Sequence, residues 1–186
     1  MKLKTLETER LRIRQFDHGD LDDCLQFRSE VFGIDSAPAD AQSWLNWTID
    51  SYRELAGLGQ PPYADYALEL RGDGSFVGSV GIVPTVVPWG ALIGDPADTL
   101  LTPEIGLFWG VLPSWRRRGY AGEAAGALLD YLFAELRARQ VVATTEQNNI
   151  ASQRTMEKLG MELLTNPSGQ PRWCQVVGLI VNPRAS

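Results

Sequence analysis

Histidine, cysteine and long apolar runs are scarce in this sequence of 186 residues. His18 is the one histidine, and Cys24 and Cys174 lie far apart, so no spacing favours a zinc site or a disulfide framework. No apolar run approaches the roughly 18 residues needed to span a bilayer, and the segment 1–14 carries charges where a signal peptide is apolar. These absences predict a reduced, cytoplasmic, metal-free protein that contacts no membrane.

The composition predicts one packed domain over residues 1–186. Apolar residues make up 44% of the chain and charged residues 22%, which excludes a disordered tail. The formal net charge of −6 makes nucleic acid a poor partner. Both a monomer and a homodimer fit these properties.

Several catalytic signatures are also missing from the sequence. There is no Walker phosphate loop, no Gly-x-Ser-x-Gly nucleophile turn and no His-Glu-x-x-His zinc motif. Serine hydrolase and metalloprotease functions are therefore excluded.

Hydrophobic periodicity predicts alternating helices and strands along the chain. Period-two patterns indicate strands, and apolar residues three and four apart indicate helices. The expected strands are 11–16, 63–70, 76–83, 104–111, 141–145, 161–164 and 173–181, and the expected helices lie in 21–32, 41–55, 121–139 and 150–159. The order strand, helix, strand around 121–139 indicates one parallel pair in an otherwise antiparallel sheet.

The segment between Pro84 and Pro103 interrupts this pattern. It holds four prolines and two glycines, which disfavour both a helix and an inner strand. We expect a long excursion there, of the kind that is usually functional or mobile.

The chemistry concentrates in a basic, glycine-containing turn between the expected strand 104–111 and the longest helix. It reads Arg116-Arg117-Arg118-Gly119-Tyr120-Ala121-Gly122. The unpaired N–H groups and positive end of a helix bind phosphate, glycines let the ligand approach, and arginines add bidentate donors. An exposed basic loop without a ligand is the simpler alternative, but the strand before the turn and the helix after it favour a phosphate site.

The sequence resembles the GNAT superfamily of acyl-CoA-dependent N-acetyltransferases. The family's Gln/Arg-x-x-Gly-x-Gly/Ala motif matches Arg116-x-x-Gly119-x-Ala121, and a second motif matches the segment from Asn149-Ile150-Ala151-Ser152 to Leu159-Gly160. Thr8-Glu9-Arg10-Leu11 and Glu104-Ile105-Gly106-Leu107 look like the branch that includes ribosomal-protein N-terminal acetyltransferases. The resemblance covers about residues 7–181. It implies a mixed α+β fold with a mostly antiparallel, twisted sheet of about seven strands, one parallel pair and about four flanking helices.

The resemblance also implies a coenzyme A site. The pyrophosphate would lie on the turn at Arg116, Arg117, Arg118, Gly119, Tyr120, Ala121 and Gly122, and the pantetheine arm would run beside the strand that ends in Trp109, Gly110 and Val111. The thioester would lie where that strand separates from the strand 141–145. A backbone N–H near Val111 would stabilise the oxyanion, and Asn149 would hold the pantetheine arm.

Acetyl transfer to an amine needs a base and an acid. Many family members supply the acid as a tyrosine seven residues after the asparagine, but Met156 stands there. In the ribosomal-protein branch a hydroxyl at the position of Ser152 supplies the acid, and the resemblance gives Ser152 this role. Glu104 is the candidate base, ahead of Glu146. Each of these residues also has a purely structural alternative. Asn149 would only cap its helix, Ser152 would only bond to the backbone, and Glu104 would be a surface residue at the end of a strand. His18 is expected in an exposed turn.

The predicted function is an N-acetyltransferase that uses acetyl-CoA without a metal. Its acceptor would be an amine, either a protein N-terminus or a small molecule, with Trp44, Trp47 or Trp89 as candidate pocket walls. A non-catalytic acyl-CoA-binding module is one alternative, favoured by Met156. An interaction scaffold built on the Pro84–Pro103 excursion is another.

Overall fold

The computed structural model of the protein describes residues 3–94, 97 and 100–184. Within these residues the helices are α1 (Leu21–Phe32), α2 (Pro38–Gly57), α3 (Trp89–Ile93), α4 (Tyr120–Ala134) and α5 (Ile150–Lys158), with 3-10 turns η1 (His18–Asp20), η2 (Pro113–Trp115) and η3 (Arg172–Cys174). The strands are β1 (Leu6–Glu7), β2 (Leu11–Gln15), β3 (Ala64–Leu70), β4 (Phe76–Val87), β5 (Thr102–Val111), β6 (Gln140–Thr145), β7 (Glu162–Thr165) and β8 (Val176–Val181).

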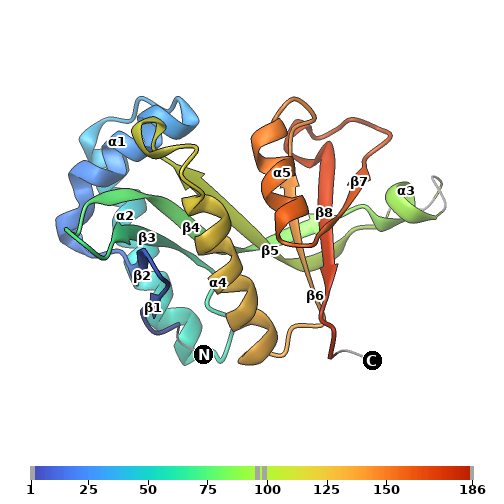
Figure 1. Ribbon diagram of the computed structural model, residues 1–186, viewed down its shortest axis with the longest axis horizontal. Coiled ribbons are helices and arrows are strands. Elements are labelled where there is room, and N and C mark those ends of the chain that lie inside the picture. The colour runs from blue at the N-terminus through green and yellow to red at the C-terminus, as the bar shows by residue number, and fades with distance from the viewer. Residues whose placement is uncertain (1–2, 95–96, 98–99, 185–186) are drawn as a thin grey trace. The chain divides into compact units, whose positions relative to one another are not determined.

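The strands form an eight-stranded sheet in the order β1-β2-β3-β4-β5-β6-β8-β7 (Figure 1). Strands β5 and β6 are parallel, with Gly106 opposite Val142, and the other recorded pairs are antiparallel. The mixed α+β architecture with one parallel pair is therefore confirmed. The predicted strand 104–111 lies inside the sheet, as β5, between β4 and β6.

The chain divides into two compact units, which we describe separately. Unit 1 comprises Met1–Ile82 and Phe108–Ala127, and unit 2 comprises Val83–Leu107 and Leu128–Ser186. Strands β4 and β5 and helix α4 contribute residues to both. A single domain over 1–186 stays a prediction.

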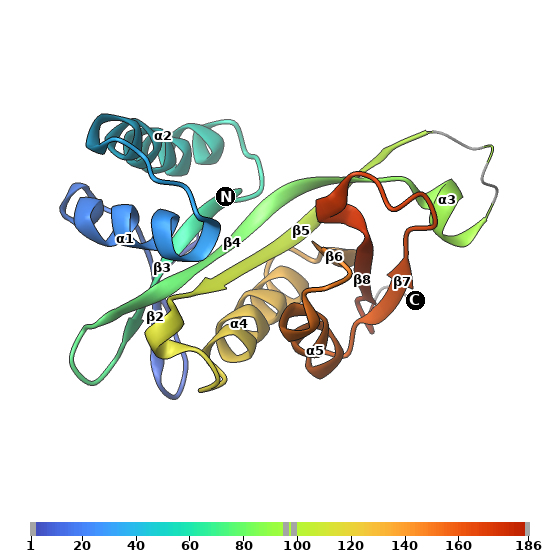
Figure 2. The ribbon, with the colours of Figure 1, turned by 90° about the horizontal axis from the view of Figure 1, so that it is seen from above.

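In unit 1, helices α1 and α2 cover one face of β2, β3 and β4, and the first half of α4 lies on the other face (Figure 2). The apolar sides of α1 and α2 meet the sheet in a core that includes Cys24, Phe27, Leu45 and Ala67. Alternate residues of a strand point to opposite faces, so the neighbours of Ala67 at positions 65 and 69 also lie on the α1/α2 face.

In unit 2, helix α5 packs on β6, β8 and β7. Met156 is fully buried, and a Cβ on Gly178 of β8 would lie 3.0 Å from the sulfur atoms of Met156 and Met161. A glycine at 178 thus leaves room for two methionines between the helix and the sheet. Val177, next to Gly178, belongs to a different apolar cluster with Val142, which Trp89 of α3 covers.

The Pro84–Pro103 excursion differs from the expectation. Strand β4 runs through Pro84 to Val87, α3 follows, and β5 already includes Pro103; residues 95–96 and 98–99 lie outside the described residues. Pro84 is tolerated because the ladder with β3 ends at Ile82, so β4 needs no N–H donor on that side beyond it.

Helix α4 is shorter than the periodicity predicts. It ends at Ala134, because Arg137 adopts a left-handed conformation with φ of 53° and the Ala138 N–H turns back to the Leu132 carbonyl. Among the described residues, no helix combines the length and the apolar character needed to cross a membrane.

Candidate active site

The turn between β5 and α4 adopts a conformation that aims backbone N–H groups outward. After η2, Arg117 has a φ of 61° and Gly119 a φ of 83°, so left-handed residues interrupt the chain just before the helix. Alternation of this kind makes consecutive N–H groups converge on a concavity that binds anions. Gly119 fits this conformation without strain.

The first turn of α4 leaves its N–H donors unused. The first helical hydrogen bond runs from the Glu123 N–H to the Gly119 carbonyl at 3.1 Å. Within the described part of the chain, the N–H groups of Gly119, Tyr120, Ala121 and Gly122 have no recorded acceptor. A Cβ on Gly122 would meet nothing within 4 Å, so the surface above these donors is open. These donors and the positive end of a 15-residue helix suit a phosphate group.

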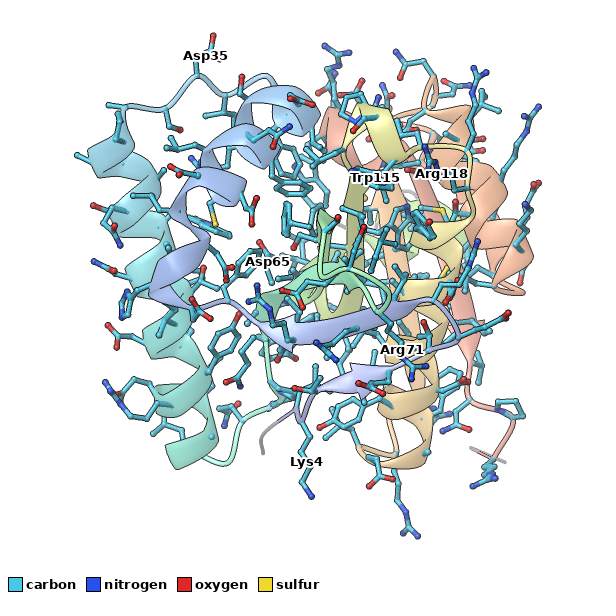
Figure 3. All side chains as sticks on the ribbon, turned by 60° about the vertical axis from the view of Figure 1, so that its left-hand side comes forward. Lys4, Asp35, Asp65, Arg71, Trp115 and Arg118 are labelled. Atoms are coloured by element: carbon cyan, nitrogen blue, oxygen red, sulfur yellow. The ribbon has the colours of Figure 1, made fainter. Side chains whose placement is uncertain are left out.

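The three arginines of the turn are exposed and carry uncompensated charge. The Arg116 Nε donates to the Val111 carbonyl at 3.0 Å, which fixes that guanidinium beside the end of β5. Arg118 lies over the Trp115 ring, with its Cζ 4.7 Å from the ring centroid, and Figure 3 shows the two side chains together. No carboxylate of the described residues forms an ion pair with Arg116, Arg117 or Arg118. The turn therefore presents positive charge to a ligand.

A partly exposed ion pair between Arg10 and Glu123 holds this turn from the side of β1 and β2. The Glu123 carboxylate, in the first turn of α4, accepts from Thr8 Oγ1 at 2.5 Å, from the Arg10 N–H at 2.9 Å and from Arg10 Nε at 2.7 Å. Arg10 also donates from Nη1 to the Arg118 carbonyl at 2.9 Å and lies 4.8 Å from the centre of the Tyr120 ring. We call Thr8, Arg10 and Glu123 the strut.

The strut keeps Glu123 ionised. Burial alone would raise its pKa, but the hydrogen bonds from Thr8 and Arg10 and the charge of Arg10 outweigh burial and lower it. The negative charge thus faces Arg10 and does not occupy the donors at the start of α4. The sequence does not reveal this contact of Arg10; the glutamate in the first turn of α4 is the one signal that could have indicated it.

In unit 2, Glu104 lies in a small pocket against α3. The Trp89 Nε1–H donates to Glu104 Oε1 at 2.6 Å, and the carboxylate forms no ion pair within the described residues. The pocket has a volume of about 260 Å³ and is lined by Trp89, Ile93, Glu104, Gln140 and Leu179. One half-buried carboxylate among apolar and aromatic walls suits a small organic cation.

Asn149 and Ser152 begin helix α5. Asn149 is the N-cap, and its Oδ1 accepts from the Ser152 N–H at 3.2 Å. The Asn149 Nδ2 and the Ser152 Oγ have no recorded partner among the described residues and could both reach a ligand. Met156 of α5, where many family members have tyrosine, is fully buried on the side of the helix that faces the sheet.

The remaining candidate residues are paired, exposed or packed in ways that indicate no role in catalysis. Glu146 is paired with Arg172 at 2.8 Å, and His18 is exposed in η1, as expected. Trp44 packs edge-on against Phe16 with 5.7 Å between ring centroids, whereas Trp47 is 65% exposed. In the described residues no group of three or more His, Cys, Asp or Glu side chains could hold a metal ion.

Comparison with known proteins agrees with this geometry. Residues 10–162 match the family described as "Acetyltransferase (GNAT) domain". The "Uncharacterized protein YkkB" of Bacillus subtilis is 31% identical over 176 residues, which cover 87% of each chain. The "Uncharacterized N-acetyltransferase YnaD" of the same organism is 45% identical over 60 residues, 32% of this chain and 34% of that protein.

Solved structures share the fold. A GNAT-family acetyltransferase from Bacillus anthracis superposes with a TM-score of 0.71 at 22% identity, covering 96% of this chain and 99% of the other. The ribosomal L7/L12 alpha-N-protein acetyltransferase RimL, solved with coenzyme A, superposes with a TM-score of 0.66 at 11% identity, covering 98% and 100%. Since the family match spans most of the sequence, this chain belongs to the GNAT acetyltransferases.

Proposed function

We propose that the protein transfers the acetyl group of acetyl-CoA to a primary amine. The observation that carries the proposal is the start of α4, where N–H donors and three arginines that find no acceptor or ion-pair partner among the described residues face open space. A pyrophosphate supplies the negative charge and the acceptor atoms that this surface lacks. RimL, which shares the fold, was solved with coenzyme A.

The coenzyme contacts follow the positions predicted from the sequence. In this proposal Arg116 to Gly122 bind the pyrophosphate and the backbone of Trp109, Gly110 and Val111 binds the pantetheine arm. Asn149 is the further residue that the family resemblance implies for this arm. Acetyl-CoA supplies the activated acetyl group. The protein's own residues orient it and move protons.

The reaction needs two proton transfers. The amine nitrogen bonds to the carbonyl carbon, the carbon–sulfur bond breaks, and the thiolate takes a proton as it leaves. A carboxylate can receive the proton of the amine. The sequence predicts Glu104 for this role, and the Trp89 Nε1–H holds one of its carboxylate oxygens. Ser152, whose Oγ has no hydrogen-bond partner in the described part of the chain, is proposed as the donor to the thiolate.

Coenzyme binding is tested by calorimetry with coenzyme A. Arg117→Gln removes a charge that no carboxylate of the described residues pairs with and should weaken coenzyme affinity. Arg12→Gln is the matched control, because Arg12 pairs with Glu7 and Glu69 on the surface. Equal affinity of the two variants would contradict the assigned pyrophosphate site.

Activity is tested by following free thiol from acetyl-CoA with a panel of primary amines: spermidine, tyramine and short peptides with free N-termini. Ser152→Ala should lower kcat without changing coenzyme affinity. Coenzyme binding without thiol release on the whole panel would favour the acyl-CoA-binding module over the enzyme.

A further inference from the structure

Asp65 of β3 is a half-buried carboxylate that no motif in the sequence singled out. It lies on the α1/α2 face, two residues from Ala67, which packs against both helices. Its backbone carbonyl accepts a hydrogen bond of 2.5 Å from the Tyr52 hydroxyl, which ties β3 to α2. Within the described residues its carboxylate has no recorded hydrogen bond or ion pair. Figure 3 labels its position near helix α1.

The Asp65 carboxylate extends over the neighbouring strand. Gly81 of β4 is its partner in the ladder, and a Cβ on Gly81 would lie 2.6 Å from Asp65 Oδ1. The carboxylate thus occupies the space that any larger residue at 81 would fill. It leans across β4 in the direction of β5.

The register of β4 and β5 identifies what lies beyond Gly81. The Leu112 N–H donates to the Val77 carbonyl at 3.0 Å. Because the strands are antiparallel, moving four residues forward along β4 corresponds to moving four residues back along β5. Gly81 therefore lies beside the segment Phe108–Trp109. Neighbouring strands lie about 4.8 Å apart. A carboxylate above Gly81 is therefore about one strand spacing from the backbone where our proposed function seats the coenzyme arm.

The groups around Asp65 do not compensate its charge. Cys24 of α1 and Tyr52 of α2 face it, and burial raises the pKa of both, so they are neutral at physiological pH. Asp20, near α1, is itself paired with Arg14 at 2.6 Å. Gly81 and the segment Phe108–Val111 carry no ionisable side chain. Burial accordingly raises the pKa of Asp65 to about 6.

We infer that Asp65, in place of the Glu104 that the sequence predicts, binds the ammonium form of the acceptor amine and takes its proton. The inference rests on the proposed function and names a residue for the acceptor side of the same reaction. One N–H bond of the ammonium breaks, its proton passes to a carboxylate oxygen of Asp65, and the freed lone pair attacks the acetyl carbon. Solvent, which reaches the half-buried side chain, carries the proton away afterwards. A base that titrates near neutrality fits this task.

The test compares Asp65→Asn with Glu104→Gln in the thiol-release assay from pH 5 to 9. In the parent protein the rate should rise with pH through a group that titrates near pH 6. Asp65→Asn should abolish this limb and lower kcat about 100-fold, the scale of a lost general base. Glu104→Gln should keep the limb. The opposite pattern would overturn the inference and leave Glu104 as the base. Asp50→Asn, an exposed aspartate of α2, is the matched control.

A second measurement needs no turnover. In the protein labelled with ¹³C at aspartate, the Asp65 carboxyl signal should titrate near pH 6, and excess n-butylamine should lower its midpoint, because a bound ammonium favours the carboxylate. An unchanged midpoint would refute the inference. Coenzyme A binding by Asp65→Asn, measured by calorimetry, should equal that of the parent. If the parent itself failed to bind coenzyme A, the proposed function would fail independently of Asp65.

Discussion

Replacing Asp65 by asparagine should stabilise the protein, and the gain should depend on pH. The pKa of Asp65 is about 6 in the folded chain against an ordinary 3.8. Each pKa unit corresponds to 1.36 kcal/mol, so the buried charge costs about 3 kcal/mol once it is fully ionised. The asparagine has no charge and therefore escapes this cost.

The direction in which the free energy of unfolding changes with pH follows from proton binding. Between pH 3.8 and 6 the folded state holds a proton on Asp65 that the unfolded state has lost, so stability falls as pH rises through this window. Below it, Asp65 is protonated in both states and the cost vanishes. The advantage of Asp65→Asn should thus grow by about 2 kcal/mol between pH 4 and pH 7.5.

Urea unfolding of both proteins at these two pH values measures this difference, because groups that titrate alike in both cancel. Hydrogen bonding of the new amide adds an offset that does not vary with pH, so the change with pH is the test. Asp50→Asn should show no such change. A pH-independent difference, or a variant less stable at pH 7.5 than at pH 4 relative to the parent, would refute the assignment of Asp65 as an unpaired buried charge.

Three further predictions concern the strut, the turn and the packing of α5. Arg10→Gln should weaken coenzyme A binding about tenfold or more, because it removes charge-assisted hydrogen bonds that hold Glu123 and the Arg118 carbonyl. Calorimetry with Arg12→Gln as the control measures this difference, and equal affinities of the two variants would contradict the prediction. Gly119→Ala, at a φ of 83°, should cost about 1 kcal/mol of stability in urea unfolding. Gly178→Ala should lower stability by about 1 to 3 kcal/mol by crowding two methionine sulfurs, and an unchanged melting curve would show that they move aside freely.

Local signals made the turn between β5 and α4 predictable from the sequence, and its coenzyme-binding role stays a prediction. Glycines, arginines and the change from strand to helix periodicity all lie within a few residues of Gly119, and the structure brings them together at the start of α4. The cap at Asn149 was equally local. The parallel pairing of β5 and β6 followed from the helix between them, because a strand-helix-strand crossover joins parallel strands.

Contacts between distant segments were not predictable. Arg10 and Glu123 meet only because the start of β2 and the start of α4 lie side by side in unit 1. Among the described residues Asp65 has no partner only because of what α1, α2 and β4 place around it. A single sequence gives the charge of such residues but not their partners. The end of α4 was predicted too late for another reason. Arg137 adopts a left-handed conformation that the spacing of apolar residues does not encode.

The two methionines buried between α5 and the sheet, Met156 and Met161, have a consequence for oxidation chemistry. Met156 is fully buried and Met161 is 5% exposed, so peroxide reaches their sulfur atoms only when α5 lifts from the sheet. The rate of sulfoxide formation at these two residues therefore reports how often this helix opens. Mass spectrometry can follow that rate in the protein without any substitution. The rate measures local unfolding of the helix that carries Ser152 and is capped by Asn149.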